Sequence, residues 1–92
     1  MNDRERLKVD TKPFKLRIES EPYAKFLGRK YSVVLDVFDV KRKKELYLSL
    51  DAQSLSQPLY ELSVTEGLLR DLEIWVVKQS DEKYAKYEVT LA

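Results

Sequence analysis

The sequence lacks both cysteine and histidine, and this double absence excludes whole classes of chemistry. Without thiolates and imidazoles the chain cannot form a zinc finger, a Cys-His nucleophile pair or a Ser-His-Asp triad. Carboxylate pairs are the remaining candidates for acid–base chemistry. However, Asp36 and Asp39 lie three positions apart on a predicted strand and so face opposite sides, and Asp81 and Glu82 fall in a charged turn. We therefore expect no enzymatic activity, no metal site and no other cofactor.

Long apolar runs are also missing. No segment approaches the roughly 18 apolar residues that cross a bilayer, and residues 1–6 lack the apolar stretch of a secretory signal. We expect no membrane partner and a cytoplasmic location, which becomes the host cytoplasm if the protein is viral. Asn and Gln together number four, whereas charged residues make up 36% of the chain. This combination is typical of high-temperature proteins and predicts a thermophilic source.

Charge is present in quantity, and its two signs are segregated along the chain. The formal net charge is only +1, but residues 13–44 contain nine basic and four acidic side chains, a balance of +5. Residues 45–82 contain two basic and eight acidic side chains, a balance of −6. A chain divided in this way can present one basic face although its total charge is near zero.

The length of 92 residues predicts a single domain with one modest core. Residues 1–12 alternate charge sign and offer only Leu7 and Val9 as apolar anchors, too few to offset the entropy of ordering the segment. We predict that residues 1–12 form a flexible charged arm and that residues 13–92 form the domain.

Five segments have the alternation or the composition of β-strands. Residues 14–19 alternate apolar and charged side chains, residues 31–40 are rich in β-branched and aromatic side chains, and residues 45–50 alternate again. Residues 68–78 and 84–91 predict a final hairpin. The side chains expected to face the core are Leu16, Ile18, Val33, Leu35, Val37, Leu46, Leu48, Leu50, Leu72, Ile74, Val76, Tyr87, Val89 and Leu91.

One short helix is predicted between the third and fourth of these strands. Asp51 is a good N-cap, and Leu55, Leu59 and Leu62, spaced four and three positions apart, share one helical stripe. Pro58 predicts a kink or a late start, and Gly67 predicts that the helix ends near Thr65. Residues 21–30 predict an irregular connection between the first two strands.

This order of elements resembles the OB-fold, a five-stranded Greek-key barrel with its helix between strands three and four. The helix and the two segments after it, residues 72–77 and 84–89, are similar to small OB-type single-strand-binding proteins of phages and archaeal viruses. The resemblance covers residues 13–92. Those proteins usually carry more glycine in the first strand and before the fourth than this chain, which has only Gly67 there, so a sheet with one covering helix and no barrel closure is the alternative.

The resemblance implies a nucleic-acid site on the outer surface of strands two and three, with the loops after strands one and four. We expect four groups of residues to contact a nucleic-acid single strand. They are outward aromatic and basic side chains on the strands, the aromatic and basic connection of residues 21–30, the basic hairpin turn and one residue near the last hairpin. For the connection the alternative is that its aromatic rings cap the barrel, and for the turn that it is merely solvated. These candidates are Lys15, Arg17, Phe38 and Tyr47; Tyr23, Phe26, Arg29 and Lys30; Lys41, Arg42, Lys43 and Lys44; and Tyr84.

Trp75 is expected to point outward from the fourth strand, away from that surface. We favour a role in the core or in an interface with a second copy over a contact with nucleic acid, because exposed tryptophan is uncommon in monomers. The sequence therefore predicts a binder of single-stranded nucleic acid, DNA in preference to RNA, without sequence specificity. The alternative is a protein interaction or assembly module, favoured by the near-zero total charge and by Trp75.

Overall fold

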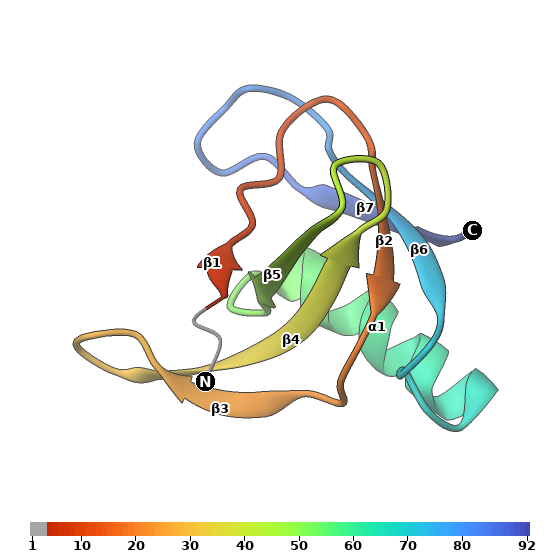
Figure 1. Cartoon of the computed structure of the whole chain (residues 1–92). Coiled ribbons are helices and arrows are strands. Elements are labelled where there is room, and N and C mark those ends of the chain that lie inside the picture. Colours follow the sequence, from red (N-terminus) through yellow and green to blue (C-terminus); the bar gives the residue numbers. More distant parts are fainter. Residues whose placement is uncertain (1–3) are drawn as a thin grey trace.

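The computed structural model describes residues 4–92, which form a single β-sheet and one helix (Figure 1). Within these residues, no helix combines the length and the apolar character needed to span a bilayer. The elements in chain order are β1 (Glu5–Arg6), β2 (Phe14–Ile18), β3 (Tyr23–Phe26), β4 (Tyr31–Asp39), β5 (Lys44–Ser49), α1 (Gln53–Glu66), β6 (Glu73–Lys78) and β7 (Tyr87–Leu91).

The strands lie in the sheet in the order β1-β5-β4-β2-β6-β7, and β3 pairs with β4. All pairs are antiparallel except β1 with β5. Because Val34 of β4 is paired with both Tyr23 of β3 and Ser49 of β5, β3 and β5 lie on opposite edges of β4. β3 therefore continues the line of β2 along one edge of β4, and the β3–β4 hairpin extends outward from the sheet (Figure 1).

The core forms where apolar side chains alternate along the strands. Leu16, Ile18, Leu35, Val37 and other inward residues of the first three predicted strands are buried with Ile74 and Val76 of β6. The helix adds Leu55 and Leu59 to the same core. The mainly β class with one helix is therefore confirmed.

Two predicted core positions are exposed. Val33 is 49% exposed although it lies on the same face of β4 as Leu35, because this part of β4 extends past the end of the core. Leu91 is exposed because it lies in β7 at an edge of the sheet.

The N-cap of the helix lies one residue after the predicted cap, Asp51. Ala52 is the N-cap and provides no side-chain hydrogen bond. The Asp51 carboxylate instead accepts a hydrogen bond from Ser32 and lies 3.8 Å from the Lys30 amino group. The helix continues through Pro58, so the predicted late start is wrong. It ends at Glu66, one residue after the predicted end, and Gly67 follows with a positive φ of 88°. Asp51 therefore interacts with Ser32 and Lys30 and does not cap the helix, so the predicted cap is wrong.

The prediction of a closed five-stranded barrel is wrong in three respects: the sheet has seven strands among the described residues, it is open, and the helix lies between its fifth and sixth strands. The five predicted segments correspond to β2, β4, β5, β6 and β7. The additional strands are β1, in the predicted arm, and β3, in the predicted irregular connection, and both precede the helix. Closure fails because β5 pairs with β1, so β7 remains an edge strand.

Residues 4–10 lie against the sheet and differ from the predicted flexible arm, of which residues 1–3 fall outside the described part. The Leu7 amide donates to the Tyr47 carbonyl of β5 at 2.9 Å, and the Lys78 amide of β6 donates to the Asp10 carbonyl at 2.8 Å. Leu7 is 6% exposed and belongs to the core cluster. Two apolar anchors are enough here because the segment fills the space beside the edge of β5 and satisfies its backbone groups.

Candidate nucleic-acid interface

Three aromatic rings lie on the sheet face that points away from the core. Strand pairing places Lys15 opposite Trp75 and Arg17 opposite Phe38. Because paired residues share a face and alternate residues repeat it, these four side chains lie opposite to the buried core positions. Asp36, two residues before Phe38, is paired with Tyr47, which puts the Tyr47 ring on the same face. We call the surface that carries Trp75, Phe38 and Tyr47 the aromatic face.

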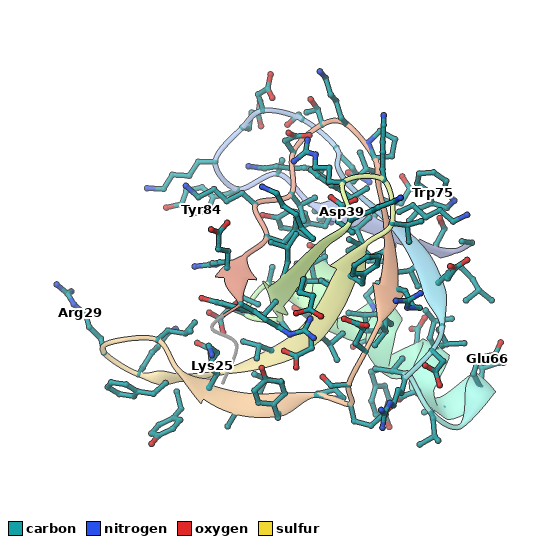
Figure 2. The ribbon with its side chains drawn as sticks, viewed as in Figure 1. Lys25, Arg29, Asp39, Glu66, Trp75 and Tyr84 are labelled. Atoms are coloured by element: carbon teal, nitrogen blue, oxygen red, sulfur yellow. The ribbon has the colours of Figure 1, made fainter. Side chains whose placement is uncertain are left out.

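Each ring of the aromatic face has a cation beside it. The Lys15 amino group lies 5.9 Å from the centroid of the Trp75 ring, and the Arg17 guanidinium carbon lies 4.8 Å from that of Phe38. The Lys25 amino group, on β3, lies 5.2 Å from the ring of Tyr47. Figure 2 labels Trp75 and Lys25 on the elements that carry them. Phe38 and Tyr47 are half-buried and Trp75 is 40% exposed, so the rings can still accept a stacked partner.

Carboxylates balance most of these cations. Lys15 lies 3.9 Å from Glu73, and Arg17 lies 3.5 Å from Glu19. Glu19 is also paired with Arg4 at 3.1 Å, and Arg4 lies 3.6 Å from Asp36. The centre of the aromatic face is therefore close to neutral, and the unbalanced positive charge lies at its borders.

Arg4 is fixed across the aromatic face by its own hydrogen bonds. Its Nη1 donates to the backbone carbonyls of Val37 at 3.1 Å and Leu46 at 3.3 Å. The side chain is only partly accessible, and its ion pairs hold the two carboxylates of the face in place. Arg4 thus acts as a structural clamp between the N-terminal segment and the sheet.

Tyr23 of β3 lies beside the same surface, and its hydroxyl donates a 2.6 Å hydrogen bond to Asp36 Oδ1. Partial burial of the phenol and this hydrogen bond to a carboxylate raise the pKa of Tyr23 from about 10 to about 12. The phenol therefore remains protonated, and remains a donor, throughout the neutral range.

Titration of the tyrosines at high pH tests this contact. Because the folded-state pKa of Tyr23 exceeds its unfolded value, its stabilising contribution is complete below about pH 10 and is lost as the pH rises toward about 12. We expect one of the six tyrosines to ionise late in the tyrosinate absorbance of the folded protein. Tyr23→Phe should remove this late step, and an unchanged late step in Asp36→Asn would contradict the assignment.

The β3–β4 hairpin does not bring Phe26 to the aromatic face. Phe26 is paired with Tyr31, and their ring centroids are 5.2 Å apart. Both residues lie on the opposite hairpin face from Tyr23 and Lys25, because the side-chain direction alternates along β3. The cation Arg29 lies at the tip of the hairpin (Figure 2), and Lys30 follows it in the turn beside Asp51. Of this predicted cluster, only Tyr23 joins the aromatic face.

The basic turn between β4 and β5 borders the aromatic face near Trp75. Asp39, only 1% exposed, accepts hydrogen bonds from the backbone amides of Lys41 and Arg42 at 3.1 Å each and so fixes the turn. The Arg42 guanidinium carbon lies 5.0 Å from the centroid of the Phe14 ring. Lys43, with a φ of 56°, and Lys44 complete the predicted basic cluster at the start of β5.

A pocket of about 630 Å³ connects this turn to Trp75. Four of its lining residues are basic and, among the described residues, Asp39 is the one acidic lining residue. The basic lining residues are Lys12, Lys15, Lys41 and Arg42. A pocket with an indole on one wall and an excess of cations suits a base joined to a phosphate.

Tyr84 lies away from these groups. It is 88% exposed in the connection between β6 and β7, with the Lys83 amino group 5.5 Å from its ring centroid. Tyr84 and its neighbours line a separate pocket at the start of α1. Figure 2 places Tyr84 and Trp75 on opposite sides of the molecule. The predicted contribution of Tyr84 to the same surface is not supported by its position.

Sequence reasoning missed the connection between Trp75 and the other rings. The outward direction of Trp75 is as predicted, but β6 pairs with β2, which places Trp75 beside Lys15 and not on a remote surface. The signal for this was the order of the strands in the sheet, not the alternation within any one strand. Arg4, Lys12 and Lys25 were also missed, since their roles depend on the arm and on β3.

Comparison with known proteins finds no match to this chain among protein-family models, curated proteins or solved structures.

Proposed function

We propose that this protein binds single-stranded nucleic acid, DNA in preference to RNA, by stacking bases on the aromatic face. The observation that carries the proposal is the common orientation of Trp75, Phe38 and Tyr47, each with a cation beside its ring. Stacking on aromatic rings tolerates any base, because every base has a π face. Binding is therefore independent of sequence.

The dimensions of the aromatic face suit a short single strand. Its rings lie on β6, β4 and β5, and β2 lies between the first two, so they span three strand intervals. With neighbouring strands about 4.8 Å apart, this distance is roughly 14 Å. The nucleic-acid strand crosses the sheet from the basic pocket beside Trp75 toward Tyr23 and Lys25 on β3. Its phosphates follow the cations at the borders of the aromatic face.

The order of the predicted strands supports the proposal, although the sheet is open and has two further strands. The five predicted strands lie in the order β5-β4-β2-β6-β7, and α1 connects β5 to β6. In OB-folds the face of the second and third strands and the loops beside it bind oligonucleotides. Here these strands are β4 and β5, which carry Phe38 and Tyr47.

Fluorescence titration with an oligothymidine of about 20 nucleotides tests the proposal, because Trp75 is the single tryptophan and reports directly on the aromatic face. We expect quenching at low salt and an affinity that falls as salt increases. The slope of log K against log salt is about −0.7 for each phosphate contacted in a single strand. Because the centre of the face is nearly neutral, we expect the slope of two to four contacts. Absence of quenching at low salt would overturn the proposal.

An assembly module is the second candidate, favoured by the carboxylates that already pair with the cations of the aromatic face. In that case carboxylates of the protein already neutralise the cations of the aromatic face, and no phosphates are required. The same titration separates the two functions: an assembly module shows no salt-dependent quenching, and its Trp75 emission changes with protein concentration instead.

A further inference from the structure

Exposed apolar side chains gather on one part of the surface, away from the aromatic face. Ten large hydrophobic residues of the described chain are exposed, and seven of them lie on the β3–β4 hairpin, on α1 or directly after it. One of the seven, Tyr23, points to the other hairpin face, beside the aromatic face, which leaves six in this group. Scattered exposed apolar residues are normal, but a concentration of this size marks an interaction site. The six residues are Phe26, Tyr31, Val33, Tyr60, Val64 and Leu68.

A groove of about 440 Å³ runs between the hairpin and the helix at the centre of this group. Val33 of β4 lines one wall and Tyr60 of α1 lines the other, with the core residues Leu50 and Leu59 at its base. The groove exists because β4 continues past the core and carries its inward face into solvent. Phe26 and Tyr31 extend this apolar surface along the hairpin, and Val64 extends it along the helix.

The two elements beside the groove carry opposite charge. The hairpin tip carries Arg29 and Lys30, whereas Lys25 points to the other hairpin face. The helix Gln53–Glu66 contains two acids, Glu61 and Glu66, and no cation. Among the described residues, the groove itself is lined by one charged side chain, Glu21. An apolar surface with a basic hairpin tip on one side and an acidic helix on the other is complementary to a copy of itself turned by a two-fold axis.

We propose that a second copy of this chain occupies the groove, with the hairpin of each protomer on the helix of the other. Phe26, Tyr31 and Tyr60 are each more than half exposed, so the three rings alone offer on the order of 350 Å². With Val33, Val64 and Leu68 the apolar surface approaches the roughly 800 Å² per partner of a standard interface. The basic hairpin tips then meet the acidic helices across the two-fold axis.

The dimer leaves the aromatic face free. Phe26 and Tyr31 lie on the opposite hairpin face from Tyr23 and Lys25, and Trp75 lies on β6, outside the groove. Dimer formation therefore does not depend on the proposed nucleic-acid function, and the two can fail separately.

Sedimentation equilibrium tests the dimer directly. We expect wild-type protein to be dimeric at about 0.1 mM, since interfaces of this size give micromolar or tighter Kd values. Tyr31→Ser, at a residue that is 72% exposed, should raise the dimer Kd at least tenfold. Tyr84→Ser is the matched control, because Tyr84 is even more exposed than Tyr31 but lies outside the groove, and the dimer Kd of this variant should be unchanged.

A charge exchange tests the arrangement of the two protomers. Arg29→Glu/Lys30→Glu makes the hairpin tip acidic like the helix, and Glu61→Lys/Glu66→Lys makes the helix basic like the hairpin tip. The Kd of the dimer should therefore rise at least tenfold for each variant alone. An equimolar mixture should restore the wild-type Kd by forming mixed dimers, with thermal unfolding of each variant as a check that it remains folded. A monomeric wild type, or a dimer weakened by Trp75→Ala but not by Tyr31→Ser, would overturn the inference, whether or not the protein binds nucleic acid.

Discussion

Trp75→Ala is expected to lower the affinity for single-stranded oligonucleotides by about fivefold or more. The indole forms one wall of the basic pocket and one end of the aromatic face, and loss of a stacked base costs about 1–3 kcal/mol. Phe38→Ala and Tyr47→Ala should each cause a similar loss, and the three losses should be nearly additive where the rings are not in contact. Fluorescence anisotropy of a labelled oligothymidine measures all three variants, since it does not require the tryptophan.

Tyr84→Ala is the matched control for these substitutions. Tyr84 also has a cation beside an exposed ring, but it lies on the other side of the molecule. Its affinity should remain within twofold of wild type, and thermal unfolding should show that all four variants are folded. Equal losses in Tyr84→Ala and Trp75→Ala would mean that aromatic rings bind nucleic acid wherever they are exposed, and the aromatic face would lose its special role.

Leu7→Ala should destabilise the protein by about 2–4 kcal/mol, the usual cost of removing a buried leucine side chain. Leu7 is 6% exposed, packs in the core cluster and follows β1, the strand that covers the edge of β5. For a domain of this size the melting temperature should fall by roughly 10 °C or more. Urea unfolding followed by circular dichroism measures the change in free energy.

Leu91→Ala provides the comparison within the same protein. Leu91 is 47% exposed at the edge strand β7, so the same substitution there should cost much less than at Leu7. If both variants had wild-type stability, the N-terminal segment would be dispensable for the fold, as its composition alone predicts.

The parts of the fold that the sequence predicts are those governed by local periodicity. The alternation of residues 14–19 and of residues 45–50 predicts β2 and β5, each to within one residue at its ends. The leucine stripe predicts α1, although the cap is wrong because Asp51 finds better partners across the chain in Ser32 and Lys30. Local patterns succeed here because burial of one face determines each element.

The parts that escaped prediction depend on partners distant in the sequence. β1 has two residues and no pattern of its own, and it forms because β5 offers an open edge. Val33 has the correct orientation for a core residue but lies past the packed core, where it lines the groove beside α1 and stays 49% exposed. Likewise, the candidate residues on β2, β4 and β5 were identified from alternation, whereas Trp75 joined them only through the pairing of β6 with β2.

The central position of β2 has a consequence for how the chain folds. β2 pairs with β4 on one side and with β6 on the other, and the connection to β6 passes through the entire helix. During synthesis, β2 therefore lacks one of its two neighbours until residue 78 has left the ribosome. Three of the strand pairs, β1 with β5, β2 with β4 and β2 with β6, join strands that are not consecutive in the chain, which slows folding and makes it cooperative. No N-terminal fragment that ends before β6 contains a complete sheet, so we expect the chain to fold as one unit after synthesis.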